Sequence, residues 1–196
     1  MTDQPFRLRA RPTLLVLAAL ALAGASAGTS YAVDRGGSNV SAKVAFLGIG
    51  SKTAGFPDLS GTALLSATDP QQIDLDVRID ARALTAPDQA TRERLKGEKF
   101  FWVEKYPTVR FQGNRMVLTD GKSGTVQGSL TARGVTRPVT LKIAFDTPPA
   151  SAKPGAPITL TGTTAINRHD FGMKSYSLIV GKTVNIALKA RLRPTG

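Results

Sequence analysis

The chain's single histidine lies in the segment Asn167-Arg168-His169-Asp170-Phe171-Gly172. A histidine beside a carboxylate is a pair that general acid–base catalysis uses, and imidazole is also the commonest metal ligand. A catalytic triad needs a nucleophile in reach, however, and the sequence contains no nucleophile motif. A metal site needs several ligands, and with no cysteine only carboxylates remain to join the histidine. We therefore expect no catalytic residue and no metal here, but a loop whose charged groups pair with each other and whose Phe171 packs inward.

A second cluster concentrates bulky apolar side chains. The runs 95–102 and 106–111 together hold the only tryptophan, one of the three tyrosines and three of the eight phenylalanines. Phe100 and Phe101 are adjacent, so they cannot share one face of a regular strand or helix. At least one of them should pack beneath a neighbouring helix. The cluster is either a lid that plugs one end of the fold or a hydrophobic gate for a ligand, and the residues support both interpretations.

The pattern between these clusters is that of β-strands. Residues 73–81, Ile-Asp-Leu-Asp-Val-Arg-Ile-Asp-Ala, alternate apolar and charged side chains, which gives a strand one dry and one wet face. Strands of this kind are also expected within 31–46, 59–67, 107–111, 126–132, 139–145, 158–166 and 184–192. Many one-sided strands with little helix predict an antiparallel sheet that buries its dry face on itself.

About eight strands form either a sandwich or a closed barrel. An eight-stranded barrel is just wide enough to be filled by side chains or to hold one slim ligand. Small residues recur on the expected dry face, at Ala42, Ala81, Gly128, Ala132 and Gly162. They leave volume inside the barrel or fit a taper, and periodicity does not decide between a filled and a hollow interior.

One short helix and several turns complete the expected organisation. Asp88 should cap a helix near 88–97, which Gly97 ends. Gly36-Gly37 should turn a pair of strands within 31–46, and the glycine-containing stretch 48–57 is expected to be a loop. Further turns or loops are expected at 69–70, 120–121, 134, 148–157 and 168–181.

The N-terminus has the layout of a secretory signal peptide. Three arginines precede the apolar run 14–23, and Ala25-Ser26-Ala27 offers a cleavage site. The sequence thus predicts a signal peptide at 1–27 and one domain at 28–196, located in the periplasm or secreted. The absence of cysteine excludes disulfides, thiolate metal sites and a lipid-modified cysteine.

The formal net charge of +12 is strongly basic. The basic residues are mostly scattered singly on the wet faces of strands, and no arginine-rich patch is interleaved with aromatics as in nucleic-acid platforms. We expect no nucleic-acid partner, whereas loose contact with an anionic membrane surface is a hypothesis that the charge permits. The sequence leaves the oligomeric state, including a homodimer, open.

Three clusters, in their order and spacing, resemble the YceI-like family of exported bacterial proteins over about Tyr31 to Leu192. The matching positions are Leu95, Phe100, Phe101, Tyr106, Pro107, Phe111, Gly128, Leu130, Thr131, Arg133, Gly134, Val135, Pro138, Val139, Arg168, Asp170, Phe171 and Gly172. The resemblance implies a lipocalin-like antiparallel β-barrel around an elongated apolar cavity. Relatives of this kind bind polyisoprenoids, isoprenoid quinones or fatty acyl amphiphiles. One departure is Arg94, where the family often has histidine.

On this basis the chain is expected to be a lipid-binding protein and not an enzyme, with no required cofactor beyond a bound isoprenoid or fatty acyl lipid. The residues expected to line the cavity or its opening are Leu95, Phe100, Phe101, Tyr106, Phe111, Ile166, Phe171 and Met173. Arg92, Arg168 and His169 are the candidates to contact a polar headgroup. Two alternatives stay open: a ligand-free structural or stress-response barrel, and an enzyme that acts on an isoprenoid with His169 and Asp170 as acid and base.

Overall fold

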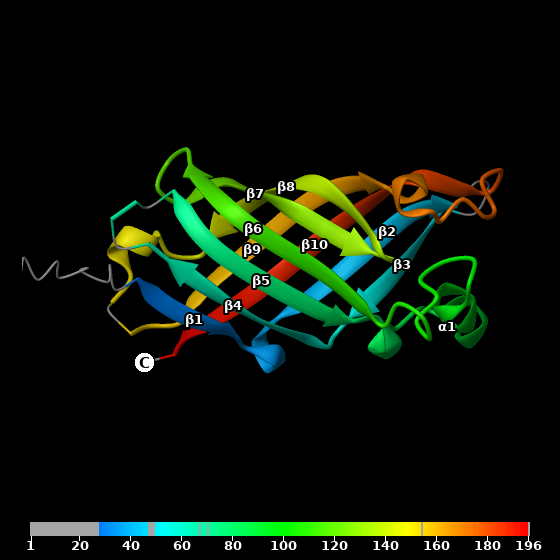
Figure 1. Cartoon of the computed structure of the whole chain (residues 1–196), viewed down its shortest axis with the longest axis horizontal. Helices are drawn as coiled ribbons and strands as arrows, with labels where there is room; N and C mark the ends of the chain where they lie inside the picture. Colours follow the sequence, from blue (N-terminus) through cyan, green and yellow to red (C-terminus); the bar gives the residue numbers. More distant parts are fainter. Residues whose placement is uncertain (1–27, 47–49, 67, 70, 154, 196) are drawn as a thin grey trace, which may run out of the picture.

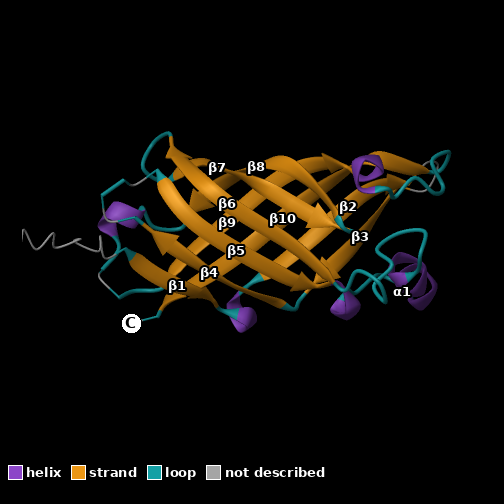
Figure 2. Ribbon diagram, viewed as in Figure 1, coloured by secondary structure: helices purple, strands orange, loops and turns teal. Residues whose placement is uncertain are grey.

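The computed structural model describes residues 28–46, 50–66, 68–69, 71–153 and 155–195. The strands are β1 (Thr29–Val33), β2 (Asn39–Phe46), β3 (Gly50–Phe56), β4 (Leu59–Leu65), β5 (Gln72–Asp80), β6 (Thr108–Leu118), β7 (Ser123–Ala132), β8 (Val135–Phe145), β9 (Ile158–Asn167) and β10 (Val180–Pro194). The helices are α1 (Gln89–Lys96) and the short 3₁₀ helices η1 (Arg35–Gly37), η2 (Ala81–Ala83), η3 (Pro149–Ser151) and η4 (Arg168–Phe171). Strands make nearly the whole wall of the molecule, and α1 lies at one end of it (Figures 1 and 2).

All strands belong to one antiparallel sheet in the order β1-β4-β5-β6-β7-β8-β9-β10-β2-β3, with a further pairing between β1 and β10. The long strand β10 pairs with β2 over Val180–Lys189 and with β1 over Leu192–Pro194, so β1 and β2 lie end to end beside it. The strands β4 and β3 pair with β1 and β2 in the same succession. The sheet therefore closes into a barrel of eight strands, two of which are interrupted. Closure confirms the barrel, in which β3 pairs with a strand on one edge only and has a single bridge, from Gly55 to Thr85, on the other.

Two local predictions were wrong. Gly36-Gly37 does not turn a strand pair, because η1 only interrupts a strand that continues from β1 into β2. The stretch 48–57 is not a loop from residue 50 onward, since Gly50–Phe56 forms β3 and pairs with β2 along its whole length. Its glycine, serine and threonine residues conceal the alternation that marks the other strands.

The helix and the turn expected at Gly134 agree with the structure. The Asp88 side chain accepts the hydrogen bond of the Thr91 backbone N–H, and α1 ends at Gly97. The β7–β8 hairpin turns at Arg133 and Gly134, which both have positive φ values of 50° and 72°. A Cβ atom at Gly134 would lie 2.9 Å from the Tyr106 ring, so this position requires glycine for both its backbone angle and its space.

The largest hydrophobic cluster lies at the end of the barrel remote from α1. Its buried members are Tyr31, Ala63, Ile73, Met116, Val126, Leu141, Ile143, Phe145, Ile158 and Leu192. Two smaller clusters, around Phe171 and around Phe56, pack nearer to α1. Within the described part of the chain, no helix has the length and apolarity that crossing a bilayer requires. The expected signal peptide, residues 1–27, lies outside the described residues.

Candidate ligand-binding cavity

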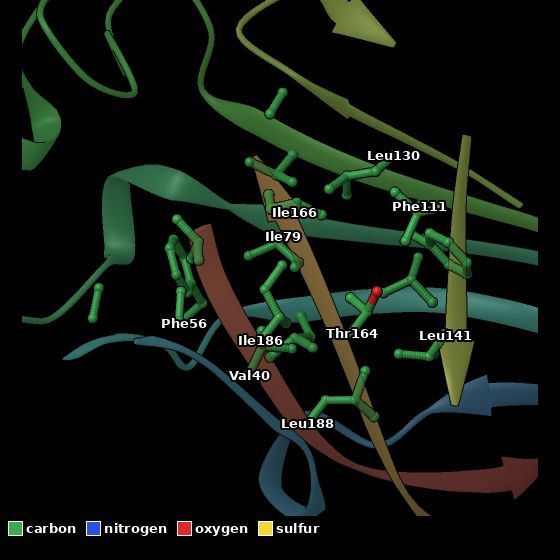
Figure 3. A pocket seen from close by; sticks show the side chains of 18 of the residues that line it. Val40, Phe56, Ile79, Phe111, Leu130, Leu141, Thr164, Ile166, Ile186 and Leu188 are labelled. Atoms are coloured by element: carbon green, nitrogen blue, oxygen red, sulfur yellow. The ribbon is translucent and has the colours of Figure 1, made fainter. Parts of the chain in front are cut away.

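The dry faces of the strands surround a cavity of about 710 Å³, to which every strand from β1 to β10 contributes. Figure 3 shows side chains from opposite walls, such as Val40, Phe111 and Leu141, pointing into the same space. The volume falls within the range of about 300–1,000 Å³ that is typical of ligand pockets. The structure therefore decides the question that periodicity left open, because the barrel interior is hollow.

Most of the wall is apolar. The inward side chains along the strands include Val40, Phe56, Leu59, Ile79, Phe111, Leu130, Leu141, Ile143, Ile166, Ile186 and Leu188. Thr164 lies among them, but its hydroxyl donates to the Thr140 carbonyl oxygen at 2.9 Å and therefore needs no acceptor on a ligand. Ala42 and Ala132, two of the small dry-face residues, are part of the wall, whereas Ala81, Gly128 and Gly162 are not.

Charged and polar side chains gather at the α1 end of the cavity, which we call the mouth. Lys52, Asp88, Thr91, Arg94 and Tyr176 border the cavity there. Side chains at this end are partly exposed: Tyr176 retains 38% of its accessible surface. The opposite end is the floor, formed by buried residues such as Met116, Phe145 and Leu192. The cavity is thus amphipathic along its length, with an apolar floor and a polar mouth.

A small network around Asp88 attaches α1 to the barrel. One carboxylate oxygen accepts the Thr91 backbone N–H at 2.7 Å, and the other accepts the Thr91 hydroxyl at 2.9 Å and the Lys52 ammonium at 3.1 Å. These bonds favour the ionised form and lower the pKa of Asp88 to about 2, with those from Thr91 as the largest cause. Lys52 belongs to β3, so the pair joins the helix to the wall of the barrel.

Aromatic contacts join the other side of the mouth. The Tyr176 ring stacks on Phe100 with a centroid distance of 5.9 Å, and the guanidinium of Arg94 lies 5.6 Å from its centre. Phe101 meets Phe56 of β3 edge to face at 5.5 Å. Both phenylalanines line the cavity, so the segment after α1 is part of the mouth and not a separate plug.

Arg168 organises the loop 172–179 that carries Tyr176. Its side chain is 2% exposed, and its guanidinium donates to the carbonyl oxygens of Met173, Ser175, Val180 and Gly181. Burial lowers the pKa of Arg168 from its usual value. The expectation that the charged groups of this segment pair with each other was wrong for this residue, because backbone carbonyls take its donors. Arg168 borders the cavity, but its hydrogen-bonding capacity serves the loop.

His169 lies outside the cavity wall, and its Nε2 is 3.2 Å from the Ser177 hydroxyl. That hydroxyl also contacts the Lys174 carbonyl oxygen. Which partner donates in the contact between His169 and Ser177 depends on the histidine tautomer. Desolvation and the nearby Arg168, Lys182 and Lys174 lower the pKa of His169. No three metal-ligating side chains gather anywhere in the described ranges.

The structure places the predicted site residues in two groups. Leu95, Phe100, Phe101, Phe111, Ile166, Arg168 and Met173 border the cavity. Tyr106, Phe171, Arg92 and His169 do not. Tyr106 instead packs against Trp102 and the turn at Gly134. Phe171 is 2% exposed, as predicted for an inward residue, and belongs to a buried hydrophobic cluster with Leu130 and Ala132. Contact of the first group with a ligand stays a prediction.

Sequence reasoning missed several residues of the mouth, namely Lys52, Thr91, Arg94 and Ile179. Lys52 was missed because the stretch 48–57 was predicted to be a loop. Lys52, Ala54 and Phe56 nevertheless have the spacing of residues on one face of a strand. Arg94 was noted only as a departure from a family pattern. A search for single charged residues on otherwise apolar strand faces would have found Lys52.

Comparison with known proteins gives one consistent result. A profile of the YceI-like domain matches residues 31–192. A UPF0312 protein of Pseudomonas savastanoi pv. phaseolicola is 30% identical over 166 residues, which cover 81% of this chain and 86% of that protein. A UPF0312 protein of Pseudomonas putida is 28% identical over 158 residues, covering 80% and 82%.

Solved structures share the fold. BcnA of Burkholderia cenocepacia superposes with a TM-score of 0.69 at 24% identity, over 81% of this chain and 98% of that one. A polyisoprenoid binding domain from Saccharophagus degradans, implicated in plant cell wall breakdown, gives a TM-score of 0.64 at 14% identity, over 85% and 99%. At these identities the likeness concerns the barrel itself.

Proposed function

The chain belongs to the family of YceI-like domains, and from this premise we propose that it is an exported lipid-binding protein that holds one amphiphile in its barrel for sequestration or transport. The ligand is a polyisoprenoid, an isoprenoid quinone or a fatty acyl amphiphile, bound in the periplasm or outside the cell. The observation that carries the proposal is the hollow, mostly apolar barrel interior with Lys52, Asp88 and Arg94 gathered at the α1 end. The structural likeness to a polyisoprenoid binding domain supports the same class of ligand.

The driving force is transfer of the hydrocarbon tail out of water. Each buried CH₂ group contributes about 0.8 kcal/mol, so a tail of many carbons has a large free-energy gain on entering an apolar cavity. The wall offers almost no unpaired polar group along the tail, since Thr164 is already bonded to Thr140. Binding of this kind needs no covalent step, and the position of His169 outside the wall supports sequestration over a reaction.

The distribution of polarity also fixes the orientation. The tail should enter first and reach the floor near Phe145 and Leu192, because burial of a polar head there would be costly. The head should remain at the mouth, where Lys52 and Arg94 offer hydrogen-bond donors. These two residues replace Arg92 and His169 as the best-placed headgroup contacts.

Extraction tests the proposal directly. The protein, purified without detergent, is extracted with organic solvent, and mass spectrometry should find a near-stoichiometric amphiphile. Binding of added geranylgeraniol and palmitate is then compared in two Ala→Trp variants. Ala42→Trp places an indole into the cavity, whereas Ala187→Trp places it on the exposed outer face of the neighbouring strand β10.

We expect Ala42→Trp to lose the extracted lipid and to bind both probes at least about tenfold more weakly, and Ala187→Trp to resemble the unaltered protein. No lipid in repeated preparations, together with no binding of either probe, would favour the ligand-free alternative. Equal binding by the two variants would show that ligands bind outside the barrel.

A further inference from the structure

The mouth carries an exposed apolar patch. Among the described residues, the large hydrophobic side chains classed as exposed are Leu64 (44%), Tyr176 (38%), Leu178 (88%) and Ile179 (43%). Three of these four fall within four consecutive positions, and two of them, Tyr176 and Ile179, also border the cavity. Single exposed leucines need no explanation, but a cluster at the opening of a lipid cavity does. We call residues 176–179 the rim tip.

The rim tip is held in place by the protein. Arg168 binds the carbonyl oxygens of Met173 and Ser175 before the tip and of Val180 and Gly181 after it. Within the tip, the backbone N–H groups of Ile179 and Val180 both donate to the Tyr176 carbonyl oxygen. Tyr176 itself is anchored on Phe100. A hydrogen-bonded turn therefore holds Leu178 in its exposed position.

Basic side chains surround the tip. Lys174 and Lys182 flank it as exposed residues of the same chain segment, and Lys99 and Arg94 lie 5.5 and 5.6 Å from the Tyr176 ring centre. None of these four cations forms an ion pair with an acid of the described residues. The whole chain carries a formal charge of +12. Apolar side chains at the centre with cations around them match the interface of an anionic bilayer.

We propose that the rim tip docks the protein on an anionic lipid bilayer. Leu178 and Ile179 enter the headgroup region, and the surrounding lysines face the lipid phosphates. The mouth then opens against the membrane, so an amphiphile passes between bilayer and cavity without its tail crossing water. Transfer rests on the proposed function, whereas docking does not, and the two are measured separately.

Docking is tested by sedimentation of the purified protein with vesicles. The vesicles contain either phosphatidylglycerol mixed with phosphatidylcholine or phosphatidylcholine alone. We expect binding to the anionic vesicles that weakens as salt is raised, and weaker binding to the neutral ones. The double variant Leu178→Ser/Ile179→Ser should lose at least about tenfold in apparent affinity. Leu64→Ser is the matched control, since Leu64 is exposed on β4 towards the floor end, and it should bind as the unaltered protein does.

Several results would overturn the proposal. These are no binding of the unaltered protein to anionic vesicles, equal binding by the double variant, or an equal loss in Leu64→Ser. A change from dimer to monomer in the double variant without vesicles would assign the tip to self-association instead. The single variant Leu178→Ser separates docking from cavity binding, because Leu178 does not border the cavity: loss of docking with retained extracted lipid leaves the proposed function standing.

Discussion

The two ends of the barrel are built from the same alternating strands but differ in what closes them. At the floor, inward side chains of β1, β6, β8, β9 and β10 meet one another, and Tyr31, Met116 and Phe145 are at most 9% exposed. At the mouth, α1 and the loop 172–179 border the opening of the cavity, and α1 lies at this end of the barrel in Figure 1. The floor is therefore held mainly by apolar packing, whereas the mouth adds hydrogen bonds and aromatic contacts to two smaller apolar clusters.

From this difference we infer that the floor contributes most to stability and that ligand enters and leaves at the mouth. Dense apolar packing loosens only when a large part of the fold unfolds, whereas a helix and a loop held by a few polar bonds open locally at low cost. A protein that must admit a lipid without unfolding needs one end of each kind. The predictions below compare the two ends, from the largest expected change in free energy to the smallest.

Truncation of an aromatic residue should separate the ends most clearly. Phe145→Ala removes a ring from the floor, and we expect a loss of about 3–5 kcal/mol in the free energy of unfolding, measured by denaturant titration. Phe101→Ala removes a half-buried ring at the mouth and should cost about 1–2 kcal/mol. Its main effect should be faster release of a bound lipid probe. Equal losses of stability at both positions would contradict the division between the ends.

Removal of the Arg168 guanidinium should loosen the mouth. Arg168→Met leaves four carbonyl oxygens without their donor, and we expect a loss of about 1–3 kcal/mol because water reaches part of the loop. Amide hydrogen exchange should rise in 172–181 and stay unchanged in β6 and β8. Arg133→Met is the matched control, since Arg133 gives a single bond to the same loop, at the Gly172 carbonyl oxygen. If exchange rises equally in both variants, Arg168 does not organise the rim.

The strands and the helix could be predicted from sequence far better than the contacts that form the mouth. Strand alternation located β5, β8, β9 and β10, because each has a dry face whose burial the fold requires. Asp88 and Gly97 located α1 through elementary capping chemistry. Patterns of this kind depend only on residues that lie close together in the sequence.

The mouth resisted prediction because its contacts join distant segments. Lys52 on β3 meets Asp88 of the helix cap, and Tyr176 meets Phe100, across separations that no local pattern encodes. Arg168 was recognised as a notable residue, yet its partners are backbone carbonyls, which carry no sequence signature. Whether side chains fill a barrel or leave it hollow depends on their volumes summed over all strands, and alternation does not measure that sum.

The smallest predicted effect is a pH dependence confined to the mouth. The pKa of Asp88 is about 2 in the folded chain, against an ordinary value of 3.8. A depressed folded pKa means that the carboxylate stabilises the folded state fully above about pH 4 and loses this contribution as the pH falls towards about 2. Acid should therefore weaken the attachment of α1 to β3. Trp102, the only tryptophan, follows α1 in the chain and reports on this end by its fluorescence.

Asp88→Asn separates this local event from general acid unfolding. An asparagine still caps the helix, but it carries no charge, so the tryptophan signal should lose the part of its acid transition that precedes loss of the β-sheet circular dichroism. The carboxyls of Asp76 and Asp120 also have lowered pKa values, through hydrogen bonds from Arg110 and from the Ser123 backbone N–H respectively, and they remain in both proteins. The sheet should consequently respond to acid alike in the two. Identical tryptophan titrations would show that the Asp88 bonds do not hold the helix, and the mouth would then depend on its aromatic contacts alone.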